Sequence, residues 1–174
     1  MIRATSSLTK KQKNDVWALL KMCDSEFVPP LSKREGTTQK NLLNEIKDSE
    51  PTEYFDALIK QSFILYTKCY KVIGFLSFIP DHKLKAGETL DINCDYISTI
   101  IVNPKYRNKG ITTAMYQKLF RERPAKKYAT RTWSQNHAHI SILDKLGFKL
   151  ILTLKDDRGE GVDTVYYAKG ENDA

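Results

Sequence analysis

A short basic turn around Gly110 carries the residues of this sequence most suited to chemistry. Lys105, Arg107 and Lys109 stand in the turn, and an apolar pattern with helical spacing starts directly after it. The first four N–H groups of a helix have no partner inside it, and the helix dipole adds positive potential at that end. Gly110 has no side chain, so the backbone can approach a ligand closely. The turn is therefore suited to hold an anion such as a phosphate group.

Ordinary surface charge on a strand-to-helix turn would also explain this segment. The sequence contains neither of the glycine patterns of nucleotide-binding loops, G-x-x-x-x-G-K-[ST] and G-x-G-x-x-G. The positive charge extends further, because residues 105–131 hold nine Lys or Arg against one acid, Glu122, in a chain of net charge +7. A phosphorylated small molecule, a nucleic acid or a solvated helix face could each account for this charge.

The spacing of apolar residues predicts the helices that surround the turn. One helix follows the turn directly, from Ile111 to just before Pro124, which would stop it. Asn136 could cap a later helix, and Gly147 stands where a left-handed C-cap would follow it. The remaining predicted helices lie at 9–22, 37–47, 52–61 and 137–146.

Short runs of β-branched and aromatic residues predict the strands. The continuous Ile and Val of residues 95–102 indicate a strand that is buried on both faces and central in a sheet. Residues 80–94 are predicted to form a polar loop before it. Further strands are predicted at 62–68, 71–79, 127–133, 148–154 and 163–169. The alternation of helices and strands indicates a mixed α/β fold.

Length and composition fit one globular domain in a reducing compartment. The chain has 174 residues, 41% of them apolar and 28% charged, and can bury a core without disulfides. No apolar run approaches the roughly 18 residues of a membrane span, and the N-terminus lacks the apolar stretch of a signal peptide. Three scattered cysteines form no disulfide framework. We expect one domain over residues 1–170, a frayed tail at 171–174, a cytoplasmic location and no membrane partner.

Two motifs on the predicted elements resemble the GNAT superfamily of acetyl-CoA-dependent N-acetyltransferases. The family carries [QR]-x-x-G-x-[GA] between its fourth strand and the next helix, which Arg107 and Gly110 match, with Thr112 at the last position. It also carries an Asn and a K-L-G-F ending around a later helix, matched by Asn136 and residues 145–148. The order of elements agrees over nearly the whole chain. The resemblance implies a GNAT-like α/β (α+β) fold, with a mixed, mostly antiparallel central sheet flanked by helices.

The resemblance also implies a reaction and a co-substrate. Members of this family move an acetyl group from acetyl-CoA to a primary amine by direct attack in a ternary complex. The turn would hold the pyrophosphate of CoA, the strand before it would run beside the pantetheine arm, and Asn136 would bond the pantetheine amides unless it is a plain N-cap. The residues expected to bind acetyl-CoA are Ile101, Val102, Arg107, Asn108, Lys109, Gly110, Ile111, Thr112 and Asn136.

The sequence does not clearly assign a general base or a general acid for this reaction. The family often uses a Glu on the fourth strand as general base, and that position falls on Tyr96, with Asp95 beside it. The two side chains face opposite ways on a strand, so at most one points at the site. In the alternative, Tyr96 is a half-buried packing residue, Asp95 is a solvated residue at the start of the strand, and a water chain acts as the base. Many family members place a Tyr at the position of Leu143 to protonate the departing thiolate, and leucine cannot do so.

The acceptor side is predicted from four residues. Arg131 and Trp133 share one face of a strand, where Arg131 could pair with a carboxylate and Trp133 could stack on the substrate. Phe27 and Pro29 would wall the pocket. Alternatively, Arg131 and Trp133 form an exposed pair on an edge strand, and Phe27 and Pro29 simply seal the core.

The expected acceptor is a small-molecule or peptide amine, and a homodimer is left open. His137 and His139 lack a third ligand nearby in the sequence, so we expect no metal. A relative that binds CoA with little turnover and a basic nucleic-acid-binding module remain the alternative functions.

Overall fold

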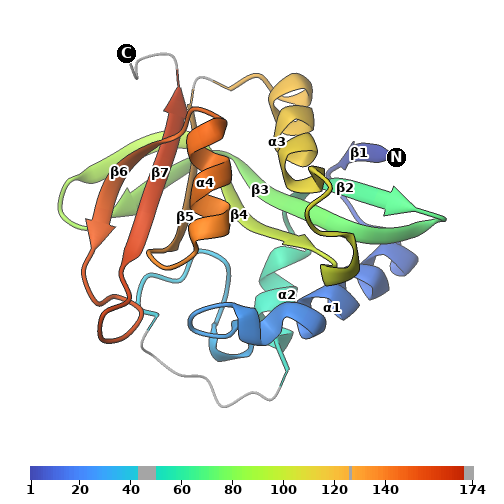
Figure 1. Cartoon of the computed structure of the whole chain (residues 1–174), viewed down its shortest axis with the longest axis horizontal. Helices are drawn as coiled ribbons and strands as arrows, with labels where there is room; N and C mark the ends of the chain where they lie inside the picture. Colours follow the sequence, from blue (N-terminus) through green and yellow to red (C-terminus); the bar gives the residue numbers. More distant parts are fainter. Residues whose placement is uncertain (43–49, 126, 171–174) are drawn as a thin grey trace.

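In the part of the chain that the structure describes, seven strands form one sheet, and helices cover both of its faces (Figure 1). The computed structural model describes residues 1–42, 50–125 and 127–170. The strands are β1 (Ile2–Thr5), β2 (Ser62–Lys68), β3 (Lys71–Ala86), β4 (Leu90–Val102), β5 (Lys127–Trp133), β6 (Lys149–Leu154) and β7 (Thr164–Gly170). Their order across the sheet is β1-β2-β3-β4-β5-β7-β6, so β4 is central, as the sequence predicts.

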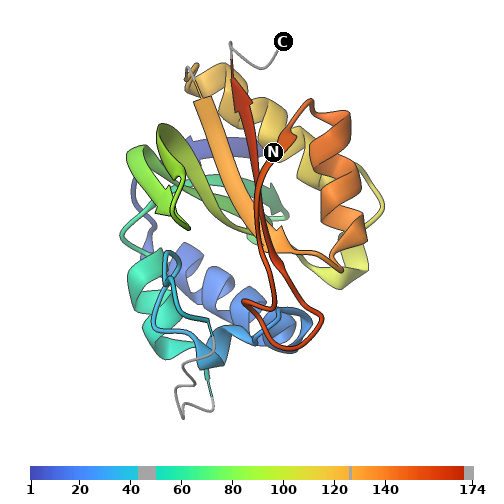
Figure 2. The same cartoon turned by 90° about the vertical axis from the view of Figure 1, so that its left-hand side faces the viewer.

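The helices are α1 (Lys10–Cys23), α2 (Thr52–Leu58), α3 (Ile111–Glu122) and α4 (His137–Lys145). Figure 2 shows α1 and α2 on one side of the sheet and α3 and α4 on the other. The alternation of β2 explains this arrangement. Its Ile64 packs in the core with α3 and α4, whereas Phe63 and Leu65 pack in the core with α1 and α2. The predicted α/β class, with a mixed, mostly antiparallel sheet flanked by helices, is confirmed.

Three sequence predictions differ from the structure. Residues 80–94 are not a loop, because β3 runs on to Ala86 and β4 begins at Leu90, so the two strands form a long hairpin. Strand β1 was not predicted. The helix predicted at 37–47 is wrong for 37–42, which form turns and bends, and 43–49 lie outside the described residues, as does the predicted tail at 171–174.

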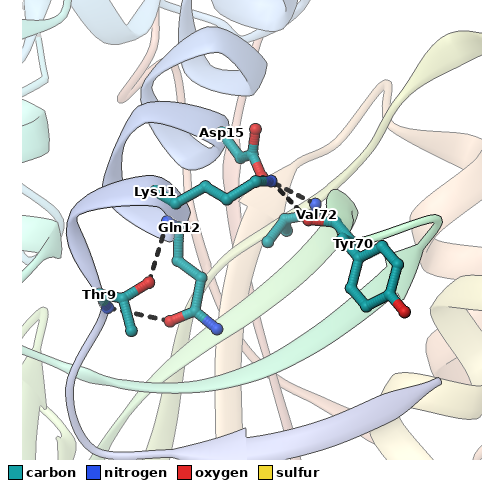
Figure 3. A network of polar contacts seen from close by, with 6 residues as sticks. All are labelled: Thr9, Lys11, Gln12, Asp15, Tyr70 and Val72. Atoms are coloured by element: carbon teal, nitrogen blue, oxygen red, sulfur yellow. Dashed lines mark hydrogen bonds and ion pairs between the residues drawn. The ribbon is translucent and has the colours of Figure 1, made fainter.

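Helix α1 is fixed at its start and against the sheet by side chains (Figure 3). Thr9 caps the helix, and Gln12 bonds back to the N–H of Thr9, which forms a capping box. Asp15 accepts a hydrogen bond of 3.0 Å from the N–H of Val72 at the start of β3, and Lys11 pairs with Asp15 at 3.3 Å. These contacts hold α1, and hence the loop that follows it, at a defined place beside the sheet.

Strands β4 and β5 run parallel for a short distance and then separate. Only residues 95–97 of β4 pair with residues 128–130 of β5, whereas β4 continues to Val102 and β5 to Trp133. A β-bulge of β4 lies at the end of this pairing. Thr99 of β4 pairs with Ser77 of β3 and Ile97 pairs with Phe78, so Ser98 between them has no opposite residue on β3. Bulges bend strands and re-aim their groups. The result is a fork in the middle of the sheet.

Candidate functional site

The fork between β4 and β5 holds a cavity of about 350 Å³. Its walls are residues 97–102 of β4, residues 130–133 of β5, the turn and first residues of α3, one side of α4 and the loop after α1. β4 pairs with β3 along its other edge. From Ser98 to Val102, the edge that faces the cavity has no partner strand among the described residues. Free backbone donors and acceptors therefore line the middle of the cavity.

The bulge at the fork is held in place by hydrogen bonds to side chains of β3, α2 and the residues that follow α2. The hydroxyl of Ser98 donates to Gln61 Oε1 at 2.5 Å and lies 2.8 Å from the hydroxyl of Ser77. The next residue, Thr99, is hydrogen-bonded to the buried hydroxyl of Tyr54 at 2.7 Å. Because these partners lie on β3, α2 and the residues that follow α2, the backbone of β4 is positioned rigidly where it meets the cavity.

One end of the cavity is the start of α3, where successive backbone N–H groups are free. The N–H groups of residues 108–113 have no acceptor among the described residues. Asn108 and Gly110 adopt left-handed backbone conformations, with φ of 60° and 70°, which turn successive N–H groups toward one side. The helix dipole adds positive potential there. This is the property predicted for the basic turn from its sequence.

Of the basic side chains of the turn, Arg107 lines the cavity, whereas Lys105 and Lys109 are not part of its lining. Arg107 donates to Val102 O at 3.0 Å and pairs with Glu26 at 2.7 Å, so it ties the end of β4 to the loop after α1. The ammonium of Lys109 lies 5.7 Å from the ring centre of Tyr106, and Lys109 is not part of the cavity lining. The positive potential at this end therefore comes from the free backbone N–H groups and the helix dipole, with the guanidinium of Arg107 beside them.

The other predicted cofactor residues lie along the cavity. Ile101, Val102, Ile111 and Thr112 line it, the first three with buried side chains. Asn136 lines it too and is also an N-cap, since its Oδ1 accepts from the N–H of His139 and its Nδ2 donates to Thr132 Oγ1 at 2.9 Å.

The opposite end of the cavity is formed by aromatic and arginine side chains. Phe27 and Trp133 both line it, with ring centres 5.8 Å apart. Arg131 lines it as well and points to the same side of β5 as Trp133, as strand alternation predicts. Pro29 is outside the lining, but its carbonyl oxygen accepts two hydrogen bonds, of 3.0 and 2.8 Å, from the guanidinium of Arg34.

Two further arginines line this end, and no local sequence pattern predicts them. Arg34 and Arg158 are both buried, line the cavity and donate to the same carbonyl, Val28 O. Arg34 lies over the ring of Phe27 at 5.6 Å and Arg158 over the ring of Trp133 at 5.9 Å. Their positions depend on segments that are more than a hundred residues apart.

Asp95 and Tyr96, the predicted catalytic residues, lie outside the lining of this cavity. Asp95 is buried, forms an ion pair with Arg123 at 2.7 Å and accepts from the N–H of Asp81. Tyr96 is buried against His82, with ring centres 5.3 Å apart. Burial raises the pKa of Tyr96 to about 12, so its hydroxyl stays protonated at neutral pH.

Helix α4 brings a different titratable group to the cavity. His139 lines it, one helical turn before Leu143, and its Nε2 lies 2.9 Å from the hydroxyl of Tyr116. Burial lowers the pKa of His139 to about 4, so the imidazole is neutral at pH 7. Leu143 itself is fully buried in the core. The pair of histidines in the sequence is thus split, since His137 is exposed.

The basic segment 105–131 does not form a single charged face. Arg107 pairs with Glu26, Lys118 with Glu122, and Arg123 with Asp81 and Asp95, while Arg131 points into the cavity. A continuous phosphate-binding surface would leave such cations free. Four of the nine cations are thus engaged in ion pairs or in the cavity lining, which weakens the interpretation as a nucleic-acid-binding module.

The match to a protein-family model decides the family. Residues 21–148 match the model of the acetyltransferase (GNAT) family. The chain belongs to the GNAT acetyltransferase family. This places it among the acetyl-CoA-dependent acyltransferases. No curated protein has a significantly similar sequence.

Solved structures show the GNAT fold over almost the whole chain. The aminoglycoside 6'-N-acetyltransferase of Enterococcus faecium is 14% identical, with a TM-score of 0.69, and the match covers 97% of this chain and 96% of that one. A ribosomal-protein-alanine N-acetyltransferase of Brucella melitensis is 15% identical, with a TM-score of 0.65, over 98% and 99% of the two chains. The acceptors named for these two neighbours differ, so the fold alone does not assign the acceptor of this GNAT protein.

A third structure was solved in complex with acetyl coenzyme A. This protein of Bacillus anthracis is 19% identical, with a TM-score of 0.51, over 64% of this chain and 63% of that one. In the described part of this GNAT chain, His, Cys, Asp and Glu side chains form no group of three or more that could hold a metal ion. No helix there is long and apolar enough to cross a membrane.

Proposed function

We propose that this GNAT protein transfers the acetyl group of acetyl-CoA to a primary amine by direct attack within a ternary complex. The observation that carries the proposal is one continuous cavity with three parts: free N–H groups at the start of α3, an unpaired edge of β4 in the middle, and an aromatic and arginine end beyond the fork. An extended cofactor with a pyrophosphate at one end and a thioester at the other matches this layout.

The phosphate end would work through the backbone. The N–H groups of residues 108–113 would donate to the pyrophosphate, with Gly110 allowing its close approach. Hydrogen bonds to a charged group contribute about 1.5–3 kcal/mol each, so several such donors outweigh one lysine. Arg107 would contribute indirectly, by holding the turn against β4. Thr112 leaves its own N–H free, so the replacement of the usual Gly or Ala is compatible with this role.

The middle of the cavity would orient the reacting groups. Acetyl-CoA supplies a thioester, an acyl group activated for attack by nitrogen. The free edge of β4 near Ile101 and Val102 would bond the pantetheine amides as a neighbouring strand would, and Asn136 would add a side-chain contact. A backbone N–H at the bulge would stabilise the charge that develops on the thioester oxygen. Catalysis would thus depend mainly on position.

The bond changes balance without a redox partner. The amine enters as an ammonium ion and loses a proton before it attacks, because an alkyl ammonium has a pKa near ~10.4. Its nitrogen then forms a bond to the acetyl carbonyl carbon, and the carbon–sulfur bond breaks. The nitrogen gives up a second proton, the sulfur leaves as thiolate and is protonated to CoA thiol, and one proton in total is released. Tyr96 and Asp95 stay predictions as bases, and water in the cavity is the alternative carrier.

The first test is a thermal melt with and without excess acetyl-CoA. A ligand at a hundred times its dissociation constant adds about 2.7 kcal/mol, which corresponds to roughly 5–10 °C for a chain of this length. We expect a shift of that size with acetyl-CoA and with CoA. An unchanged melting temperature at millimolar acetyl-CoA would sink the proposal, whereas a shift without turnover on any amine would favour the CoA-binding relative.

We further propose a cytoplasmic location. The three cysteines, Cys23, Cys69 and Cys94, are all free thiols, which suits a reducing compartment.

A further inference from the structure

Three arginines lie at the end of the cavity beyond the fork, and their charges are not balanced by ion pairs among the described residues. Arg34, Arg131 and Arg158 all line it, and no ion pair joins any of them to a carboxylate in the described part of the chain. Three acids near the arginines are engaged otherwise, because Glu26 of the cavity lining pairs with Arg107, Asp24 accepts from Ser32 and Asp157 accepts from Thr164. The partners of the arginines are backbone carbonyls, hydroxyls and aromatic rings, all of them neutral.

Such a cluster is costly without a counter-charge. Buried charges are ordinarily paired, and like charges in one low-dielectric site repel each other. Burial lowers the pKa of Arg34 to about 10, with Arg131 acting in the same direction. Burial also lowers the pKa of Arg158 to about 9, and both other arginines add to this effect. All three are still charged at neutral pH, so the end of the cavity carries a strong positive potential.

Arg131 offers an open hydrogen-bond donor inside this cluster. One of its terminal nitrogens, Nη2, is buried and has no hydrogen-bond partner within the described residues, while Nη1 donates to the hydroxyl of Tyr166 at 3.4 Å. A guanidinium nitrogen that is buried without an acceptor is rare and calls for a ligand. Arg34 and Arg158, by contrast, are fixed by their shared carbonyl, which preorganises them around the open position.

The surroundings of Arg131 repeat the same charge. A second cavity, of about 220 Å³, touches Arg131 from the other side and is lined by Lys40, Lys83, Lys85 and His82 without any acid among the described residues. Lys83 and Lys85 share the single carboxylate of Asp91. Positive potential therefore extends from the arginines toward solvent, which would attract an anionic molecule and repel a polycationic one.

We propose that Arg34, Arg131 and Arg158 bind an anionic group of the acceptor, so that the acceptor is a primary amine that also carries a carboxylate or a phosphate group. This inference rests on the proposed transfer to an amine and names its substrate class. Arginine suits both anions, because its planar guanidinium donates two parallel hydrogen bonds to a carboxylate or to a phosphate. The anion would fix the acceptor in the arginine end and direct its amine toward the fork, where the bulge presents the thioester.

The test compares amines in matched pairs. One pair is an amino acid and its amide, and the other is O-phosphoethanolamine and ethanolamine, so the two sources of negative charge are distinguished. We expect kcat/KM to be higher for the anionic member of at least one pair by roughly 10–100-fold, the value of about one charge-assisted bond. Equal or faster acetylation of the neutral members would overturn the inference and leave the proposed function standing.

Variants locate the preference. Arg131→Gln should abolish the preference for the anionic member. Arg131→Lys should retain part of it, because the positive charge stays but the planar guanidinium with its paired donors is lost. Arg121→Gln removes one charge from an exposed position of α3 and should leave the preference as in the wild type. A preference that survives in Arg131→Gln, with an unchanged melting temperature, would contradict the assignment.

If no amine is acetylated, the same pairs are compared by titration calorimetry against CoA-saturated protein. Selective binding of the anionic members would uphold the arginine site although the transfer reaction had failed, and unselective binding would reject it.

Discussion

Gly110→Leu should weaken acetyl-CoA binding by roughly 10–100-fold, which corresponds to the loss of about one charge-assisted bond. Gly110 has a φ of 70°, which costs a residue with a Cβ about 1–2 kcal/mol. No atom of the described residues lies within 4 Å of the position that a Cβ would take, so there is room for the side chain among them. The strained backbone would turn the neighbouring N–H groups away from the pyrophosphate, and the new side chain would occupy its place. Titration calorimetry with acetyl-CoA measures the change.

Gly161→Leu is the matched control. Gly161 has a φ of 72° and equally open space around it, but it lies in the turn between β6 and β7, outside the cavity lining. Both variants should lose similar thermal stability, and only Gly110→Leu should lose affinity. Equal affinity of the two variants for acetyl-CoA would remove the turn from the proposed binding site.

Acidification should destabilise the protein through His139. Its pKa is lowered to about 4 by burial, against 6.5 for an unperturbed histidine. Between these pH values the unfolded chain binds a proton that the folded protein does not, so the free energy of unfolding falls as the pH falls from 6.5 to about 4. Above pH 6.5 the effect is absent. Its full size is at most about 3 kcal/mol, and the partial exposure of the side chain reduces it.

His139→Gln separates this contribution from the rest of the titration. The glutamine amide can still bond the hydroxyl of Tyr116 but does not titrate. Urea unfolding at pH 7 and pH 4.5 should therefore show a smaller loss of stability in His139→Gln than in the wild type. His137→Gln, an exposed position of the same helix, should behave as the wild type. Equal losses in all three proteins would contradict the burial of a neutral imidazole in the cavity wall.

The elements that could be predicted are those specified by local patterns. The apolar run of β4, the glycine of the basic turn and the helical spacing of α3 each lie within a few neighbouring residues, and the structure confirms all three. The extension of β3 and β4 was missed although Leu84 and Ala86 alternate with exposed lysines, because polar residues on the open face resemble a loop. Strand β1 depends on pairing with β2, sixty residues away, and has no strong pattern of its own.

The candidate site likewise has one part that local sequence patterns predict and one part that depends on tertiary contacts. The phosphate end follows from one motif, whereas the arginine end depends on Arg34 and Arg158, which meet at Val28 O through tertiary contacts alone. His139 had a usable signal: it stands four residues before Leu143 on the buried face of α4, which marks an inward side chain. Its neighbour in the sequence pattern, His137, obscured that signal.

In the proposed function, the cavity at the fork brings acetyl-CoA and an amine together for direct transfer. The most direct measurement incubates the protein with acetyl-CoA and a panel of primary amines, and follows both free thiol and the N-acetylated amine by mass spectrometry. We expect the two products in equal amounts, dependent on the amine and strongly reduced in Gly110→Leu. Thiol released without any acetylated amine, or equal product from wild type and Gly110→Leu at limiting acetyl-CoA, would contradict it.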